Sequence, residues 1–191
     1  MSDLTERLFF ALDLHHNGVN QSSFRQLCQL KQDLQCDGRA VPERNLHITL
    51  AFLGPVTAGQ KQALINHTGD LAAIPAFSVS YSQLTYRKRN KIIWLDSENP
   101  PSPLLTLAAE LKQAAIKAGL QQEERLYRPH ITLKKQVRHT PVSLPAPPDL
   151  IFDFRHFGLY ISEAIQTPHG SGVRYRCLQQ WPLSQPAKES K

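Results

Sequence analysis

The chain has 191 residues, of which 41% are hydrophobic and 20% are charged, and this ordinary globular composition excludes a disordered chain. Its length allows one sizeable hydrophobic core or two small fused lobes. The formal net charge of +6 and the isoelectric point near 9.4 favour polyanionic partners, because a basic surface attracts phosphate groups.

The first half of the chain alternates strand and helix patterns. A short apolar run at residues 8–14 predicts a buried strand, and it is too short for a signal sequence or a membrane span. We therefore expect a cytoplasmic protein that does not associate with membranes. Residues 20–34 predict a helix, residues 46–53 a second strand, and residues 57–71 a second helix with Thr57 as its N-cap.

The second half contains more strands. Residues 77–85 and 92–96 have the pattern of strands and flank a basic loop at residues 86–91. An apolar stripe along residues 104–118 predicts a helix. Further strands are expected at 130–134, 152–162 and 173–181, with a proline-rich connection at 141–148 and a loose C-terminal tail at 182–191.

Strands and helices interleave, but the expected hairpins argue against a purely parallel sheet, so we predict an α+β fold. The order of the elements suggests two similar halves within a single domain of residues 1–181. The three cysteines, Cys28, Cys36 and Cys177, lack the C-x-x-C spacing of zinc and redox sites and are expected to be reduced structural thiols.

A repeated tetrapeptide is the most informative feature of the sequence. His47-Ile48-Thr49-Leu50 recurs letter for letter at residues 130–133, a separation of 83 residues. On a strand, His47 and Thr49 would point to one face, while Ile48, Leu50 and Phe52 would point to the other. The second copy would present its polar pair in the same way, so two imidazoles and two hydroxyls could converge on one site.

Two imidazoles suit the cleavage of a phosphodiester. Histidine titrates near pH 6.5, so one ring can accept a proton while the other donates one, on opposite sides of an in-line displacement. Threonine hydroxyls beside them could donate hydrogen bonds to the non-bridging phosphate oxygens. The pattern therefore predicts His47 and His130 as the acid-base pair, with Thr49 and Thr132 as phosphate-binding residues.

The paired motifs resemble those of the two-histidine phosphoesterase superfamily. Within it, residues 45–54 (NLHITLAFLG) and 128–133 (RPHITL) are similar to the bacterial and archaeal RNA 2′,3′-cyclic phosphodiesterases, historically called 2′-5′ RNA ligases. Residues 7–13 (RLFFALD) are similar to the first strand of that family. The resemblance extends from about residue 7 to residue 181.

The resemblance implies a bilobal pseudo-twofold fold, in which two βαβ-type halves with antiparallel sheets surround a central cleft. It also implies that His47 is the proton donor to the leaving 3′ oxygen and that His130 is the proton acceptor from water. The product would be an RNA 2′-phosphomonoester, formed without a metal or another cofactor. Ligation would be the same chemistry with an RNA 5′-hydroxyl as nucleophile and without ATP.

The chain departs from the family pattern at one position. The family often has an arginine five residues after the second histidine, where this chain has Lys135, preceded by Lys134. Lysine keeps the charge but loses the bidentate geometry of arginine. Strict alternation along the strand would place Lys134 on the histidine face, so either lysine could contact phosphate. Other candidate RNA contacts are Arg128, Tyr86, Arg87 and the rest of the basic loop, Arg174 and Tyr175.

Several alternatives stay open. The chain could be a noncatalytic RNA- or nucleotide-binding module, or a phosphodiesterase of small cyclic nucleotides. The histidines could bind a metal, although neither motif has a carboxylate or cysteine at ligand spacing. We expect a monomer that acts on RNA with 2′,3′-cyclic phosphate ends, tRNA fragments among them. His15 and His16, at the end of the first strand, are expected to be a solvated pair.

Overall fold

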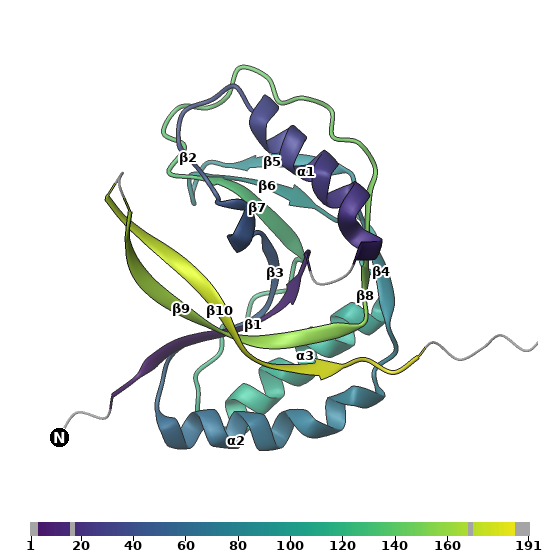
Figure 1. The fold of residues 1–191 in the computed structure, drawn as a ribbon, viewed down its shortest axis with the longest axis vertical. Coiled ribbons are helices and arrows are strands. Elements are labelled where there is room, and N and C mark those ends of the chain that lie inside the picture. The colour runs from purple at the N-terminus through teal and green to yellow at the C-terminus, as the bar shows by residue number, and fades with distance from the viewer. Residues whose placement is uncertain (1–3, 16–17, 168–169, 186–191) are drawn as a thin grey trace, which may run out of the picture.

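The computed structural model describes residues 4–15, 18–167 and 170–185 of the chain (Figure 1). The helices in this part are α1 Gln21–Asp33, α2 Ala58–Thr68 and α3 Ser102–Lys117, with short 3-10 turns at η1 Gly18–Asn20, η2 Glu43–Asn45 and η3 Gly69–Ala73. The strands are β1 Glu6–Asp13, β2 Arg39–Ala40, β3 His47–Val56, β4 Phe77–Tyr81, β5 Gln83–Arg87, β6 Ile92–Asp96, β7 His130–Lys135, β8 Leu150–Phe154, β9 His156–Thr167 and β10 Gly170–Pro182.

The three α-helices confirm the helix predictions. α2 begins at the expected N-cap, where the Thr57 hydroxyl accepts a hydrogen bond from the Gln60 N–H at 3.3 Å and the Gln60 side chain accepts one from the Thr57 N–H at 3.1 Å. The apolar stripe of α3 is buried, at Leu104, Leu107, Ala108, Leu111 and Ala115. Within the described residues, no helix is both long and apolar enough to cross a membrane.

Two segments that were each predicted as a single strand form two strands each in the structure. Residues 77–85 form β4 and β5, and residues 152–162 belong to β8 and β9. The division has a topological cause, because β4 and β8 pair with each other in a separate two-stranded sheet. The chain therefore changes sheet in the middle of each predicted strand.

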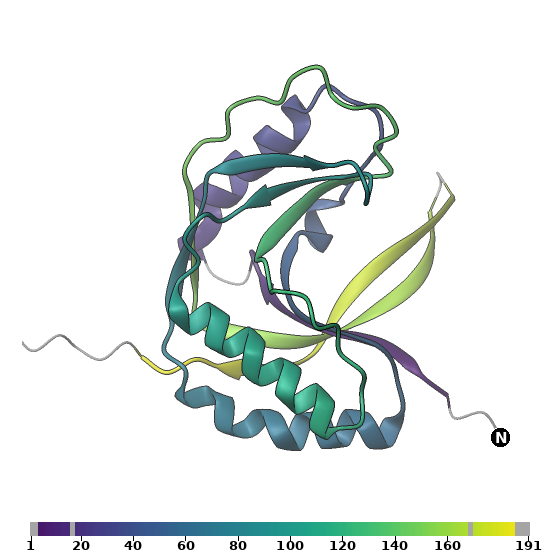
Figure 2. The same ribbon diagram turned by 180° about the vertical axis from the view of Figure 1, so that it is seen from behind.

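The large sheet has the strand order β10-β9-β1-β3-β7-β6-β5, and β2 pairs with β7 beside this path. Every pairing between named strands is antiparallel, which confirms the mixed fold with antiparallel sheets. α2 and α3 lie together at one end of the molecule and α1 lies at the other (Figures 1 and 2). β9 and β10 continue past β1 as a two-stranded ribbon (Figure 1).

The two copies of the tetrapeptide meet at the centre of this sheet. β3 and β7 pair at Ile48 and Ile131, the second residue of each copy. On the outer sides, Asp13 of β1 is the register partner of His47, and Asp96 of β6 is the register partner of His130. The two motifs and their flanking aspartates are therefore related by a local twofold axis that passes between Ile48 and Ile131. The division into two lobes stays a prediction, since one continuous sheet crosses both halves.

Matched β-bulges follow the two motifs. In β3, Phe10 pairs with Ala51 and Ala11 with Thr49, so Leu50 is an extra residue. In β7, Ile93 pairs with Lys134 and Trp94 with Thr132, so Leu133 is the extra residue there.

Each bulge reverses the alternation of faces beyond it. Ile48, Leu50, Ile131 and Leu133 are buried as predicted, but the prediction that Phe52 joins them is wrong. Phe52 is 55% exposed because the bulge at Leu50 shifts it to the opposite face.

The C-terminal boundary also differs from the prediction of a loose tail that begins at residue 182. The side chain of Leu183 is buried, and its N–H donates to the Arg155 carbonyl at 2.8 Å. The Ser184 N–H donates to the Ile74 carbonyl at 2.8 Å. Ordered packing thus continues to Ser184, and residues 186–191 lie outside the described part.

Candidate active site

His47, the first residue of β3, is held by hydrogen bonds on both ring nitrogens. Its Nδ1 lies 2.7 Å from the Asn45 carbonyl oxygen, and its Nε2 lies 3.0 Å from the Thr49 Oγ1. A carbonyl can only accept, so Nδ1 carries a proton and Nε2 is the nitrogen that can exchange one. The rings of Phe9 and Tyr175 contact the imidazole at centroid distances of 5.1 and 5.0 Å.

His130, the first residue of β7, is held in a similar way. Its Nδ1 lies 2.8 Å from the Arg128 carbonyl oxygen, two residues earlier, as His47 Nδ1 does with Asn45. Nε2 is therefore again the nitrogen that can exchange a proton. The imidazole contacts the Trp94 indole in a tilted arrangement, with ring centroids 4.0 Å apart and an interplanar angle of 36°.

Burial lowers the pKa of both histidines. Burial is the largest cause of the drop in the pKa of His47 from 6.5 to about 4, and the positive charges of Lys135 and of protonated His130 add to it. The pKa of His130 is also lowered, chiefly by burial, with further lowering by Arg125 and Arg87. At neutral pH both free rings are uncharged, and an anionic phosphate between them would raise both pKa values.

The two threonines of the motifs lie on the same strand faces as the histidines. Thr49 and Thr132 are partly exposed, while the isoleucines between each His and Thr are fully buried. The Thr49 hydroxyl contacts His47, and in the described part of the chain the Thr132 hydroxyl has no hydrogen-bond partner. With His47 Nδ1 protonated, the Thr49 hydroxyl donates to His47 Nε2, and it becomes free to bind phosphate when that nitrogen takes up a proton.

Lys134 and Lys135 have different surroundings. Lys134 is buried, and its Nζ donates to the carbonyl oxygens of Leu34 and Cys36, both at 2.8 Å. Lys135 is partly exposed and close enough to His47 for its charge to lower the pKa of that histidine. The expectation from strict alternation was wrong because the bulge at Leu133 turns Lys134 away from the histidine face and Lys135 toward it.

A cavity of about 300 Å³ lies beside His47. Aromatic side chains, the carboxylate of Asp13 and the guanidinium of Arg44 form much of its wall. This volume is at the lower end of the range for small-molecule sites in proteins. The lining residues are Phe9, Asp13, His15, Arg44, Asn45, Leu46, His47, Tyr160, Tyr175 and Cys177.

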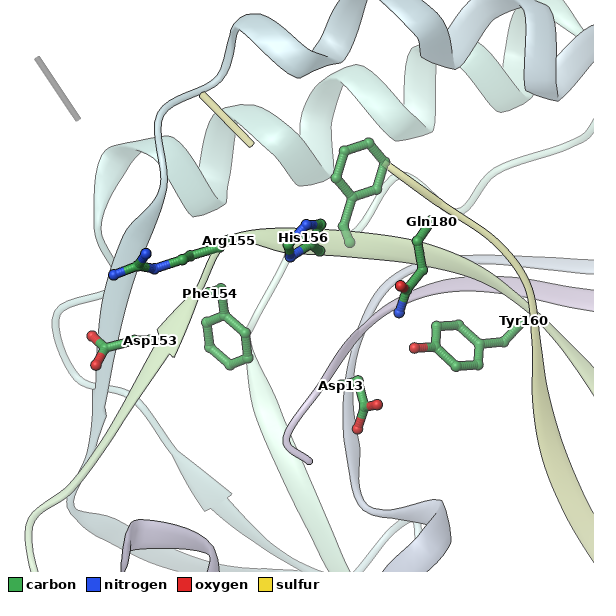
Figure 3. A pocket seen from close by; sticks show the side chains of 8 residues that line it. Asp13, Asp153, Phe154, Arg155, His156, Tyr160 and Gln180 are labelled. Atoms are coloured by element: carbon green, nitrogen blue, oxygen red, sulfur yellow. The ribbon is translucent and has the colours of Figure 1, made fainter. Parts of the chain in front are cut away.

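Figure 3 shows a second cavity, which shares Asp13 and Tyr160 with the first. The Tyr160 hydroxyl points toward Asp13 and Gln180 in this view, and Asp153, Arg155 and His156 line its far side. Its volume of about 10 Å³ is roughly that of one water molecule, so it is too small for a ligand.

The remaining predicted contacts are scattered. The Tyr86 hydroxyl donates to the Val137 carbonyl at 3.1 Å, and Arg87 lies over the Trp94 indole at 4.6 Å. The Arg128 side chain is exposed, and Arg174 lies 3.9 Å from Glu163 on the neighbouring strand. The Tyr175 ring contacts the His47 imidazole directly, and the Arg128 carbonyl contacts His130 Nδ1.

Four of the residues that sequence reasoning missed flank the two motifs: Phe9, Asp13, Trp94 and Asp96. They lie on β1 and β6, the strands that flank the two motifs, and only the register across strands identifies them. His15 is exposed, as expected, and its Nε2 lies 2.9 Å from the Glu43 carbonyl oxygen where it lines the cavity. His16 lies outside the described residues. Residues 4–15, 18–167 and 170–185 contain no cluster of three or more His, Cys, Asp or Glu suited to a metal.

Known proteins are similar to this chain in sequence and in fold. The family model of the 2′-5′ RNA ligase superfamily matches residues 21–159, which include both tetrapeptides. RNA 2′,3′-cyclic phosphodiesterase of Escherichia coli (strain K12) is 32% identical over 182 residues, which cover 94% of this chain and 98% of the relative. The protein of the same name in Thermotoga maritima is 30% identical over 142 residues, which cover 71% of this chain and 72% of the relative.

Solved structures agree with these matches. The crystal structure of E. coli LigT complexed with 3′-AMP has a TM-score of 0.84 and 32% identity, covering 95% of this chain and 99% of that one. The protein TT0787 of Thermus thermophilus shares the fold, with a TM-score of 0.72 at 20% identity over 94% and 98% of the two chains. The chain therefore belongs to the 2′-5′ RNA ligase superfamily, as the two His-x-Thr-x motifs predicted.

Proposed function

We propose that the chain is an RNA 2′,3′-cyclic phosphodiesterase in which His47 and His130 are the acid-base pair. The pairing of Ile48 with Ile131 carries the proposal, because it brings the two motifs side by side with both histidines on one face of the sheet. The names of the E. coli and T. maritima relatives support the same activity. A noncatalytic binding module would have no need of two matched imidazoles.

The hydrolysis follows from the two Nε2 atoms. A water oxygen attacks phosphorus while His130 accepts the proton of the water, and the bond from phosphorus to the 3′ oxygen breaks as His47 protonates that oxygen. The RNA keeps the phosphate on its 2′ oxygen as a monoester. These roles of donor and acceptor rest on the family resemblance. The low pKa of His47 makes its imidazolium a strong acid once the substrate's negative charge has promoted its protonation.

Three side chains are proposed to bind the phosphate: Thr49, Thr132 and Lys135. Thr49 and Thr132 can each donate a hydroxyl hydrogen bond to a non-bridging oxygen, where negative charge grows in the transition state. Lys135 adds a positive charge, while Lys134 has its Nζ engaged by two carbonyl oxygens. With an RNA 5′-hydroxyl in place of water, the same groups would make a 2′-5′ linkage without ATP, because the cyclic phosphate is strained.

The substrate proposed is RNA with a 2′,3′-cyclic phosphate end, tRNA fragments among the candidates. The aromatic cavity beside His47 has room for part of a nucleoside, and the net charge of +6 favours a polynucleotide. Tyr86, Arg87 and Arg128 are further candidates for contact with the RNA. We propose a cytoplasmic monomer that acts as a single domain and needs no metal or cofactor.

The test is incubation of the purified protein with a short RNA ending in a 2′,3′-cyclic phosphate, in the presence of EDTA, followed by identification of the product. The wild type should yield the 2′-phosphomonoester. His47→Ala and His130→Ala should each lose about 10²-fold or more in rate. His67→Ala, an exposed histidine on α2, is the matched control and should keep the wild-type rate.

Other outcomes would replace the proposal. Hydrolysis of cyclic mononucleotides without any turnover of RNA would indicate a phosphodiesterase of small nucleotides. RNA binding without turnover of either substrate would indicate a binding module. Loss of the activity in EDTA would overturn the metal-free mechanism.

A further inference from the structure

A stack of side chains lies against His130. The Trp94 indole contacts the imidazole at 4.0 Å, and the Arg87 guanidinium lies over the same indole at 4.6 Å. Trp94 and Arg87 come from β6 and β5, whose hairpin forms one edge of the large sheet. The ring of a candidate catalytic residue is therefore held by an element that lies between the two motifs in sequence and belongs to neither.

One carboxylate oxygen holds the stack together. Asp96 Oδ2 accepts a hydrogen bond from the Trp94 Nε1–H at 2.7 Å and another from the Thr85 hydroxyl at 3.2 Å. The same oxygen lies 3.9 Å from Arg87 Nη2. The Asp96 side chain is only 15% exposed, so these contacts are largely protected from water. Without the Asp96 carboxylate, the Trp94 indole would lose its hydrogen bond and the Arg87 guanidinium would lose its ion pair.

Asp96 also controls the charge around His130. The charged groups that act on this imidazole are Asp96 from β6, Arg87 from β5, Arg125 from the segment before β7, and His47 from β3. Three of these groups are positive or can become so, and Asp96 is the one negative group. The Arg128 carbonyl and, after it, Asp96 favour a proton on His130; Asp96 does so by opposing the charge of the arginines, and the indole face also attracts a cation.

We propose that Asp96 and Trp94 are positioning residues for His130, which fix the orientation of its ring and stabilise the imidazolium that forms when it accepts a proton. This inference rests on the proposed function, in which His130 takes part in proton transfer. Neither residue needs to touch the substrate. Their effect should appear in the rate of proton transfer and in its pH dependence, and not in substrate affinity.

The local twofold axis supplies a matched control. Asp13 is the register partner of His47, as Asp96 is of His130. Asp13 acts on His47 through charge alone, since its carboxylate accepts from the His15 N–H at 2.8 Å and no indole lies between it and the imidazole. Asp13→Asn and Asp96→Asn should therefore alter different histidines.

The experiment measures kcat/KM and kcat against pH with an RNA 2′,3′-cyclic phosphate, for wild type, Asp96→Asn, Asp13→Asn, Trp94→Phe and Trp94→Leu. In Asp96→Asn, the limb of the pH-rate profile that reports the titration of His130 should move to lower pH by about one unit. The limb that reports the titration of His47 should stay in place. Asp13→Asn should move only the His47 limb. Trp94→Leu should lower kcat about tenfold with little change in KM, and Trp94→Phe should restore most of it.

A second readout is independent of turnover. NMR titration of the His130 ring in the folded protein should show a lower pKa in Asp96→Asn than in wild type, and an unchanged one in Asp13→Asn. A shift in this titration together with an inactive wild type would refute the proposed function, and Asp96 would then only stabilise a protonated His130 that transfers no proton to or from a substrate. An unchanged His130 titration in a folded Asp96→Asn variant, or equal shifts in both aspartate variants, would overturn the inference.

Discussion

Lys134 and Lys135 are adjacent in the chain but differ in what their ammonium groups contact. Lys134 Nζ binds the carbonyl oxygens of Leu34 and Cys36, at the end of α1. Lys135 lies near His47, and burial together with the charge of Arg39 lowers its own pKa. The sequence alone identified this pair but not the member that faces the site, because that depends on a bulge one residue earlier.

Substitution of the two lysines should separate stability from activity. Lys134→Met leaves two carbonyl oxygens without their donor and should cost about 1 to 3 kcal/mol in the free energy of unfolding. Lys135→Ala should lower kcat/KM about 10²-fold and leave stability nearly unchanged, while Lys135→Arg should keep most of the activity. Urea unfolding and steady-state kinetics check this, and a large activity loss in a fully folded Lys134→Met variant would contradict it.

His47 should make the stability of the protein depend on pH. Because its pKa falls from 6.5 to about 4 in the folded state, the unfolded chain binds the extra proton between these values. The contribution of the neutral ring to stability is complete above pH 6.5 and is lost as the pH falls toward 4. The shift corresponds to at most about 3 kcal/mol, and the partial exposure of the ring reduces the expectation to about 1 to 2 kcal/mol.

The comparison of wild type with His47→Gln isolates this effect, since glutamine does not titrate. Between pH 8 and pH 4.5, wild type should lose about 1 to 2 kcal/mol of unfolding free energy relative to the variant. Urea unfolding at both pH values measures the difference. Parallel losses in the two proteins would mean that the His47 pKa is not depressed.

At the scale of elements, the alternation of apolar residues predicted most of the strands and helices that position the site. It placed Ile48, Leu50, Ile131 and Leu133 in the core correctly. It failed at Phe52, since a bulge arises from pairing with a neighbouring strand and leaves no mark in the alternation of one strand. The separate sheet formed by β4 and β8 could not be predicted for the same reason, because it also depends on which strands pair.

One buried amide adds to the pairing of β9 with β1 in holding the β9–β10 ribbon. Asn45 is 3% exposed, its Nδ2 donates to the Val173 carbonyl at 2.8 Å, and its Oδ1 accepts from the Tyr175 N–H at 3.3 Å. These two bonds fasten the ribbon beside His47, whose imidazole the Tyr175 ring contacts edge-on. A residue just before the first motif is thus tied to the far end of the chain.

Asn45→Ala should loosen the ribbon without removing any charged group. We expect a loss of about 1 to 3 kcal/mol in the free energy of unfolding, together with faster amide hydrogen exchange that is concentrated in β10 near Val173. Hydrogen exchange with mass spectrometry resolves this. Exchange that increases evenly over the whole sheet, or not at all, would show that Asn45 does not anchor the ribbon.

At the scale of the whole molecule, the exact repeat of four residues predicted that two halves contribute equivalent groups to one site. The structure adds how they meet, through Ile48 and Ile131, and shows that the equivalence includes Asp13 and Asp96. The segments of those aspartates share only the dipeptide Leu-Asp, at residues 12–13 and 95–96, which is too short to stand out, so the folded register is what identifies them. The lobes themselves and the roles of donor and acceptor stay predictions.

The acid-base pairing of His47 and His130 is tested most directly by the pH dependence of kcat/KM on an RNA 2′,3′-cyclic phosphate. Wild type should give a bell-shaped profile whose optimum lies below pH 6.5, because burial lowers both pKa values. The residual activity of His47→Ala and of His130→Ala should each lose one limb of the bell. A flat profile from pH 5 to 9, with the chemical step limiting the rate, would contradict the pair.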